Sequence, residues 1–138
     1  MMTNNRRFVF DTNVLISAFL FSQNKPRQAL DQAQDIGIIV LSNSVLSELE
    51  EVLYRPKFDR YLTKERRQEF LQNLTENSQF IDVTEQINEC RDLKDNKYLE
   101  LALSGQVECI VTGDVDLLVL NPWRGIEILN VKEFLASK

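Results

Sequence analysis

Acidic side chains follow two apolar, strand-like runs in this chain of 138 residues. Asp11 ends the first run, which begins at Arg6 and leads directly into a helical pattern. A second run over 107–112 leads through a glycine to Asp114 and Asp116. Because open α/β sheets bind ligands at the carboxyl ends of their strands, we expect these carboxylates at a ligand-binding edge. Mg²⁺ and Mn²⁺ prefer oxygen ligands, so the pattern predicts a divalent-cation site.

Two predicted helices contribute further acids. Glu48 lies at the edge of the apolar stripe of a helix that ends near Tyr54, and Asp95 lies on the inward face of a helix over 92–104. Asp92, three residues earlier, shares that face. Each acid alone also fits a structural role, as a helix cap or a boundary salt bridge. Four separate elements that each offer an inward or edge carboxylate favour a cation site, because like charges brought together repel unless a cation neutralises them.

The absence of histidine restricts the chemistry that this chain can perform. Ser-His-Asp and Cys-His nucleophilic systems need an imidazole and are excluded. The two cysteines, without histidine or a CxxC spacing, do not form a usual zinc site. The net charge of −5 argues against tight, purely electrostatic binding of nucleic acid. Asp11, Glu48, Asp95, Asp114 and Asp116, the five acids predicted around the metal, account for that charge, so the remaining surface is neutral on average.

Strand-like and helical patterns alternate along the chain, which predicts an α/β fold with a parallel sheet between two layers of helices. The strands are expected over 6–11, 38–41, 80–83, 107–112 and 126–129. The helices are expected over 12–22, from Pro26 to a stop at Gly37, from 42–44 to about 54, from about 63 through 74, and over 92–104, 117–118 and 131–136. Pro26 suits a first helical turn and Gly37 a helix end.

The length predicts a single domain over residues 1–138. The longest apolar stretch, Val14 to Phe21, is far shorter than the roughly 20 residues needed to span a bilayer. No signal-peptide pattern is visible at the N-terminus. We therefore expect a cytoplasmic protein without a membrane partner.

Taken in order, the acidic segments resemble those of the PIN-domain ribonucleases. The segments are residues 10–17, Glu48 in its helix, residues 91–102 and residues 111–118. The resemblance spans nearly the whole chain and is strongest to the subgroup described as toxin components of toxin–antitoxin pairs. That subgroup commonly has a second Asp after the key acid of its third segment, where this chain has Asn96. This difference weakens any predicted role for position 96 and does not affect the predicted role of Asp95.

The resemblance implies a sheet order of 3-2-1-4-5 and a metal-dependent endoribonuclease with Mg²⁺ or Mn²⁺ as cofactor. It assigns the catalytic, metal-binding quartet to Asp11, Glu48, Asp95 and Asp114, with Asp116 as a fifth metal ligand. Asn13 and Thr112, together with Asp92, are placed beside the site or against the substrate. The implied partners are an RNA substrate and an antitoxin protein. The last helix and the 58–74 stretch offer apolar surface for a homodimer.

Four basic residues are candidates for contacts with RNA phosphates. Arg66 and Arg67 belong to the helix that begins near Thr63, and Lys94 and Lys97 flank the acid at position 95. Any one of them also fits a solvated, charged helix face. Their contribution is expected to appear in the salt dependence of RNA binding.

Two other interpretations stay open. A Mg²⁺-dependent phospho-acceptor or phosphohydrolase also uses a strand-end Asp, but the haloacid-dehalogenase type requires Asp-x-Asp after strand one, where Asn13 occupies the second position. A receiver domain would place its acceptor on strand three, where Asp82 lies. The second interpretation is a non-catalytic PIN-like module that binds proteins, since fold alone does not fix function. Such a module is expected to lack the carboxylates that this chain retains.

Overall fold

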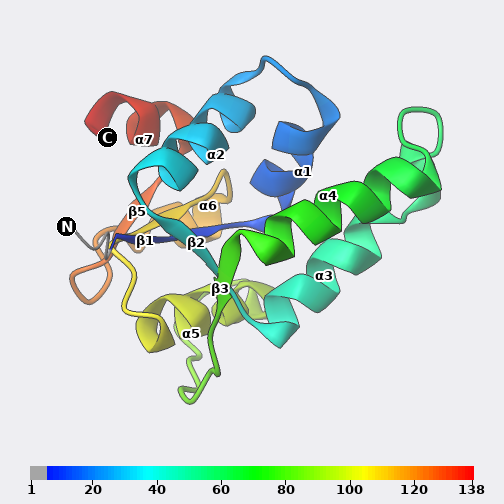
Figure 1. Ribbon diagram of the computed structural model, residues 1–138. Coiled ribbons are helices and arrows are strands. Elements are labelled where there is room, and N and C mark those ends of the chain that lie inside the picture. Colours follow the sequence, from blue (N-terminus) through cyan, green and yellow to red (C-terminus); the bar gives the residue numbers. More distant parts are fainter. Residues whose placement is uncertain (1–5) are drawn as a thin grey trace.

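The first strand of the protein, β1, lies at the centre of a five-stranded parallel sheet. The computed structural model describes residues 6–138 and gives the order β3-β2-β1-β4-β5 (Figure 1). The strands are β1 (Arg7–Phe10), β2 (Ile38–Leu41), β3 (Ser78–Phe80), β4 (Cys109–Val111) and β5 (Glu127–Leu129). The predicted α/β class and the strand order 3-2-1-4-5 are confirmed.

The inner strands are continuous apolar runs, as is typical of parallel strands covered on both faces. Every residue of β4 is buried, and so are the last three residues of β1 and of β2. The edge strand β3 differs: it was predicted over 80–83 and forms two residues earlier. β3 pairs with β2 alone, and its side chains are only partly covered: Ser78 is half-buried, and Phe80 is 46% exposed.

Helices cover both faces of the sheet (Figure 1). On one face α2 (Lys25–Ile36) packs against α7 (Val131–Ser137), whose Phe134 ring meets Phe8 and Phe10 edge-on. On the other face α5 (Asn96–Ser104) contacts β1 and β4. The sheet is therefore the middle layer of the predicted three.

Four helices begin after strands at the carboxyl edge of the sheet. They are α1 (Thr12–Leu20) after β1, α3 (Asn43–Leu53) after β2, α6 (Val115–Leu118) after β4 and α7 after β5. In each case the residue before the helix caps it: the side chains of Asp11, Ser42, Asp114 and Asn130 accept hydrogen bonds from backbone N–H groups of the first turn. The strand-end acids are thus fixed by helix capping at the edge where ligands bind in such folds.

The segment before α5 departs from the helix predicted over 92–104. Residues Leu93–Asp95 form a 3₁₀ turn, η2, and the α-helix starts at Asn96. Asp92 directs the chain into this turn by accepting a hydrogen bond from the Lys94 backbone N–H at 3.1 Å. Because side chains three residues apart eclipse each other in 3₁₀ geometry, the turn brings Asp92 and Asp95 together.

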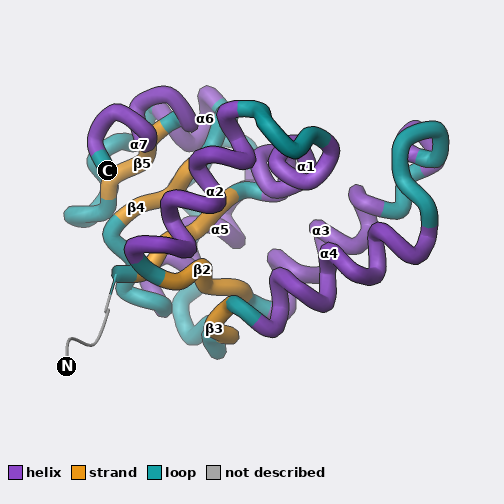
Figure 2. Tube along the Cα trace, turned by 45° about the horizontal axis from the view of Figure 1, so that its top comes forward, coloured by secondary structure: helices purple, strands orange, loops and turns teal. Residues whose placement is uncertain are grey.

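Helices α3 and α4 (Lys64–Glu76) lie side by side and extend past the sheet as an arm (Figure 2). The connection at the end of the arm contains a 3₁₀ turn, η1 (Pro56–Phe58). Here Lys57 lies 5.1 Å from the centroid of the Phe58 ring, and Arg60 lies 5.6 Å from that of Tyr61. Basic and aromatic side chains therefore occur together at the end of the arm.

Within residues 6–138, none of the helices combines the length and the apolar character required to cross a membrane.

Candidate active site

A polar pocket of about 200 Å³ lies at the carboxyl ends of the paired strands β1 and β4. The residues that line it are Asp11, Thr12, Asn13, Glu48, Val52, Arg55, Asp92, Lys94, Asp95, Tyr98 and Asp114. Successive strands add to opposite sides of β1, so the pocket lies at the switch point of the sheet. The four acids predicted from separate elements therefore line one pocket.

Asp11 is both a helix cap and a wall of the pocket. Its Oδ1 accepts a hydrogen bond from the Val14 backbone N–H at 2.8 Å, and its Oδ2 accepts one from the hydroxyl of Thr112. Burial raises the pKa of Asp11, and these two hydrogen bonds offset part of the rise. The backbone N–H of Asp11 also donates to Val111 at 3.0 Å, which fixes the end of β1 against β4.

Glu48 has hydrogen-bond partners for both of its oxygens. Oε1 accepts from the hydroxyls of Thr12, at 2.9 Å, and of Tyr98. Oε2 accepts from the Lys97 ammonium at 3.1 Å. Burial acts to raise the pKa of Glu48, but the hydrogen bonds from Tyr98, Lys97 and Thr12 outweigh it and lower the pKa. Glu48 is therefore held as an anion between α1 and α5.

Asp92, Asp95 and Asp114 form the acidic cluster, in which one carboxylate oxygen from each lies within 4.8 Å of the others. Burial raises the pKa of Asp95 to about 8, and the adjacent Asp114 adds to the rise. The hydrogen bond between the two lowers the pKa of Asp114. The Oδ2 atom of Asp95 is buried and has no hydrogen-bond partner among the described residues. Acids this close require either a proton or a cation between them.

The donor set of the acidic cluster fits a divalent cation such as Mg²⁺ or Mn²⁺. It consists of oxygens alone, which hard cations prefer. The buried, unpartnered oxygen of Asp95 is the polar atom that such an ion would satisfy. The sequence interpretation placed Asp92 beside the site, whereas the structure makes it a member of the cluster.

The other predicted site residues lie around the cluster. The Thr112 hydroxyl links Asp11 to the backbone N–H of Asp114, which it meets at 3.0 Å. Asn13 lines the pocket with an exposed side chain. Asp116 donates its backbone N–H to Asp114 at 2.9 Å and lies outside the set of pocket-lining residues. Its role as a fifth metal ligand stays a prediction.

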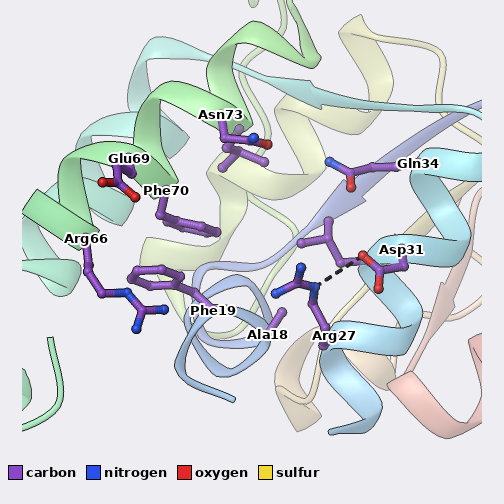
Figure 3. A pocket seen from close by; sticks show the side chains of 11 residues that line it. Ala18, Phe19, Arg27, Asp31, Gln34, Arg66, Glu69, Phe70 and Asn73 are labelled. Carbon is purple, nitrogen blue, oxygen red and sulfur yellow. Dashed lines mark hydrogen bonds and ion pairs between the residues drawn. The ribbon is translucent and has the colours of Figure 1, made fainter. Parts of the chain in front are cut away.

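Arg66 and Arg67 lie away from the acidic cluster. Arg66 extends along Phe19, its guanidinium 5.7 Å from the ring centroid, in a separate cavity of about 230 Å³ between α1, α2 and α4 (Figure 3). Arg67 is only 6% exposed, pairs with Asp59 at 3.0 Å and lies over the Tyr54 ring. The buried guanidinium of Arg67 holds the two halves of the arm together. The RNA contacts of Arg66 and Arg67 stay predictions.

Sequence reasoning missed Thr12, Arg55 and Tyr98 as residues that line the pocket. Tyr98 lies on the buried face of its helix, and its hydroxyl lies 2.7 Å from that of Thr12. A signal was available, since a buried tyrosine hydroxyl usually requires a hydrogen-bond partner. Arg55 follows α3 and pairs with Glu51 at 3.0 Å, and nothing in its sequence context indicated a pocket.

The sequence matches the PIN domain family over residues 7–116, a range that contains every acid of the pocket. The chain belongs to the PIN domain family. Members of this family are generally nucleases, which supports the predicted class of enzyme. A relative of this PIN domain, the uncharacterized protein MJ1680 of Methanocaldococcus jannaschii, is 34% identical over 116 residues. The alignment covers 83% of this chain and 74% of the relative.

Two solved structures share the fold of this PIN domain. VapBC2 from Rickettsia felis, bound to a DNA fragment from their promoter, superposes with a TM-score of 0.60 at 15% identity, covering 90% of this chain and 98% of that one. PAE2754 from Pyrobaculum aerophilum superposes with a TM-score of 0.62 at 14% identity, covering 96% of this chain and 88% of that one. At such low identity the likeness establishes the fold alone.

Proposed function

We propose that this PIN domain is a divalent-cation-dependent endoribonuclease. The observation that carries the proposal is the acidic cluster, where three carboxylates converge and a buried oxygen of Asp95 lacks a partner among residues 6–138. A divalent cation held by Asp92, Asp95 and Asp114 would supply Lewis acidity that activates water and neutralises charge on a phosphodiester. Hydrolysis by water does not use the RNA 2′-hydroxyl, so the products should carry 5′-phosphate and 3′-hydroxyl ends.

The residues around the cluster bind and orient the substrate. Arg55 and Lys94 line the pocket with exposed cationic side chains, which suits contacts with the phosphates on either side of the cleaved bond. Asp11 is fixed by Thr112 and by its cap on α1, so its carboxyl group keeps its place in the pocket wall. The basic and aromatic end of the arm offers stacking surfaces and charge to a single strand farther from the pocket.

A toxin role is proposed on the sequence resemblance to the toxin subgroup. Under this proposal the protein acts in the cytoplasm, and its partner is an antitoxin protein that blocks the acidic pocket. The structural neighbour VapBC2, which was solved with promoter DNA, supports a search for such a partner. Purification of the natively expressed protein, followed by mass spectrometry, should recover a small co-purifying protein. The purified chain alone is the expected active form.

The test is cleavage of single-stranded RNA by purified protein with Mn²⁺, Mg²⁺ or EDTA. Asp11→Asn and Asp95→Asn should abolish cleavage, whereas Asp82→Asn makes the same chemical change at an exposed acid after β3 and should not. Acetyl phosphate labelling at Asp82 would instead support the phospho-acceptor. Products that end in 2′,3′-cyclic phosphate would refute hydrolysis by water. A folded protein that binds Mn²⁺ but cuts no RNA would favour the non-catalytic module.

A further inference from the structure

The acids of the pocket fall into two groups according to whether hydrogen-bond donors of the protein already reach both of their carboxylate oxygens. Asp11 and Glu48 have hydrogen-bond donors on both oxygens. The acidic cluster instead contains three carboxylates in close approach and a buried oxygen without a partner in the part of the chain described. The demand for an external cation is therefore concentrated in the cluster.

The charge of Glu48 is balanced by an ion pair with a lysine on another helix. Lys97 lies in the first turn of α5, and its ammonium lies 3.1 Å from Oε2 of Glu48 on α3. Both side chains are largely sheltered, with exposed fractions of 21% for Lys97 and 24% for Glu48. An ion pair at this depth is screened less by solvent and salt than a surface pair. The lysine thus brings a fixed positive charge to the end of the pocket that Glu48 occupies.

The remaining oxygen of Glu48 is also unavailable to a metal ion. Oε1 receives hydrogen bonds from the hydroxyls of Thr12 and Tyr98. Tyr98 in turn accepts a hydrogen bond from the backbone N–H of Thr12 at 3.1 Å, so its ring cannot turn away without leaving a buried donor unpaired. Replacement of these donors by an ion would break contacts among three elements.

We infer that Lys97 acts as a built-in cation for Glu48. The protein therefore binds one divalent ion, at the acidic cluster. Glu48 anchors Lys97 and is not a metal ligand. The inference rests on the proposed cation dependence and specifies its stoichiometry. Lys97 is a positioning residue: it holds Glu48 and supplies, at that carboxylate, the positive charge that a second ion would otherwise have to supply.

Lys94 provides a matched control for Lys97. It carries the same charge, lies one turn earlier in η2 and lines the pocket that Glu48 also lines. Its side chain is exposed, and within residues 6–138 the observed ion pair of Glu48 is with Lys97. Loss of the Lys94 charge therefore changes the net charge of the pocket without releasing Glu48.

The test is titration of the metal-free protein with Mn²⁺, with free ion followed by electron paramagnetic resonance and binding by calorimetry. The wild type, Lys94→Gln and Lys97→Arg should bind one ion. Lys97→Gln should bind a second ion, which the added change Glu48→Gln should remove. In the wild-type background, Glu48→Gln should alter the affinity less than about threefold, whereas Asp95→Asn should weaken it by about a hundredfold or more.

Binding of two ions by the wild type would overturn the inference, and so would retention of a single ion by folded Lys97→Gln. A tenfold loss of affinity in Glu48→Gln would also overturn it by making Glu48 a ligand, and this measurement decides the case if Lys97→Gln does not fold. A wild type that binds no Mn²⁺ would overturn this inference and the cation dependence together. One-site binding without RNA cleavage would overturn only the proposed function.

Discussion

Cation binding to the acidic cluster should release a proton, because Asp95 retains one in the metal-free pocket. Burial and the adjacent Asp114 raise the pKa of Asp95 to about 8. A group with that pKa is roughly 90% protonated at pH 7, and a cation that binds the ionised oxygen must displace the proton. The same competition should weaken the apparent affinity for Mn²⁺ by about 50-fold between pH 8 and pH 6.

Calorimetry in buffers of different ionisation enthalpy measures the proton release directly. At pH 7 the dependence of the observed heat on buffer enthalpy should correspond to roughly 0.9 proton per ion bound. Asp95→Asn should show no such release, and Asp82→Asn, outside the pocket, should match the wild type. Release below about 0.3 proton, or an affinity that stays constant from pH 6 to pH 8, would refute the assignment of the proton to Asp95.

The raised pKa of Asp95 also has a consequence for stability without metal. Because its pKa is higher in the folded state than in the unfolded chain, the folded state binds more protons between pH 4 and pH 8. The stability contributed by this group is therefore present at low pH and is lost as the pH rises through about 8. In EDTA, the thermal midpoint of the wild type should decline with rising pH more steeply than that of Asp95→Asn.

Three further predictions concern the frame of the pocket. Tyr98→Phe removes a buried hydroxyl that makes three contacts. Urea denaturation should show a loss of about 2–4 kcal/mol in the free energy of unfolding, against less than about 0.5 kcal/mol for Tyr61→Phe at an exposed position. Equal effects would contradict the role of that hydroxyl. Gly37→Ala places a Cβ 2.3 Å from a backbone oxygen and should lower the thermal midpoint; an unchanged midpoint would argue against this packing. Lys94→Gln should reduce the salt slope of RNA binding in EDTA by about 0.7, whereas Arg67→Met should leave the slope unchanged and lower stability instead. The reverse outcome would support Arg67 as an RNA contact.

The parts of the fold that were predicted well are those in which local pattern and tertiary environment agree. The inner strands, such as Ile38–Leu41, are apolar throughout because both faces are covered. The caps at Asp11 and Ser42 depend on neighbouring backbone groups alone, so the sequence reveals them. For the same reason the residue pattern alone is enough to place the strand-end acids at one edge of the sheet.

The errors occur where a distant partner, or a local side-chain hydrogen bond that the apolar pattern does not reveal, decides the conformation. The edge strand is fixed by backbone pairing with β2 and by the Ser78 hydroxyl, which donates to Leu74 at 2.6 Å, not by apolar alternation. The 3₁₀ turn before α5 follows from the side chain of Asp92, which the helical pattern conceals. Lys97 and Arg67 appear as equivalent surface cations in the sequence, yet one reaches Glu48 across 49 residues and the other is buried. Such pairings follow from the tertiary fold.

The strand order also determines when during synthesis the pocket can form. β1 is made first and lies at the centre of the sheet, but its neighbour β4 is made last but one. The hydrogen bond between Thr112 and Asp11 closes a loop of 101 residues, and contacts of such long range form late in folding. A chain still on the ribosome therefore has β1 with one open edge and lacks Asp114. The acids of the proposed site therefore stay apart until Asp114, residue 114 of 138, has been translated.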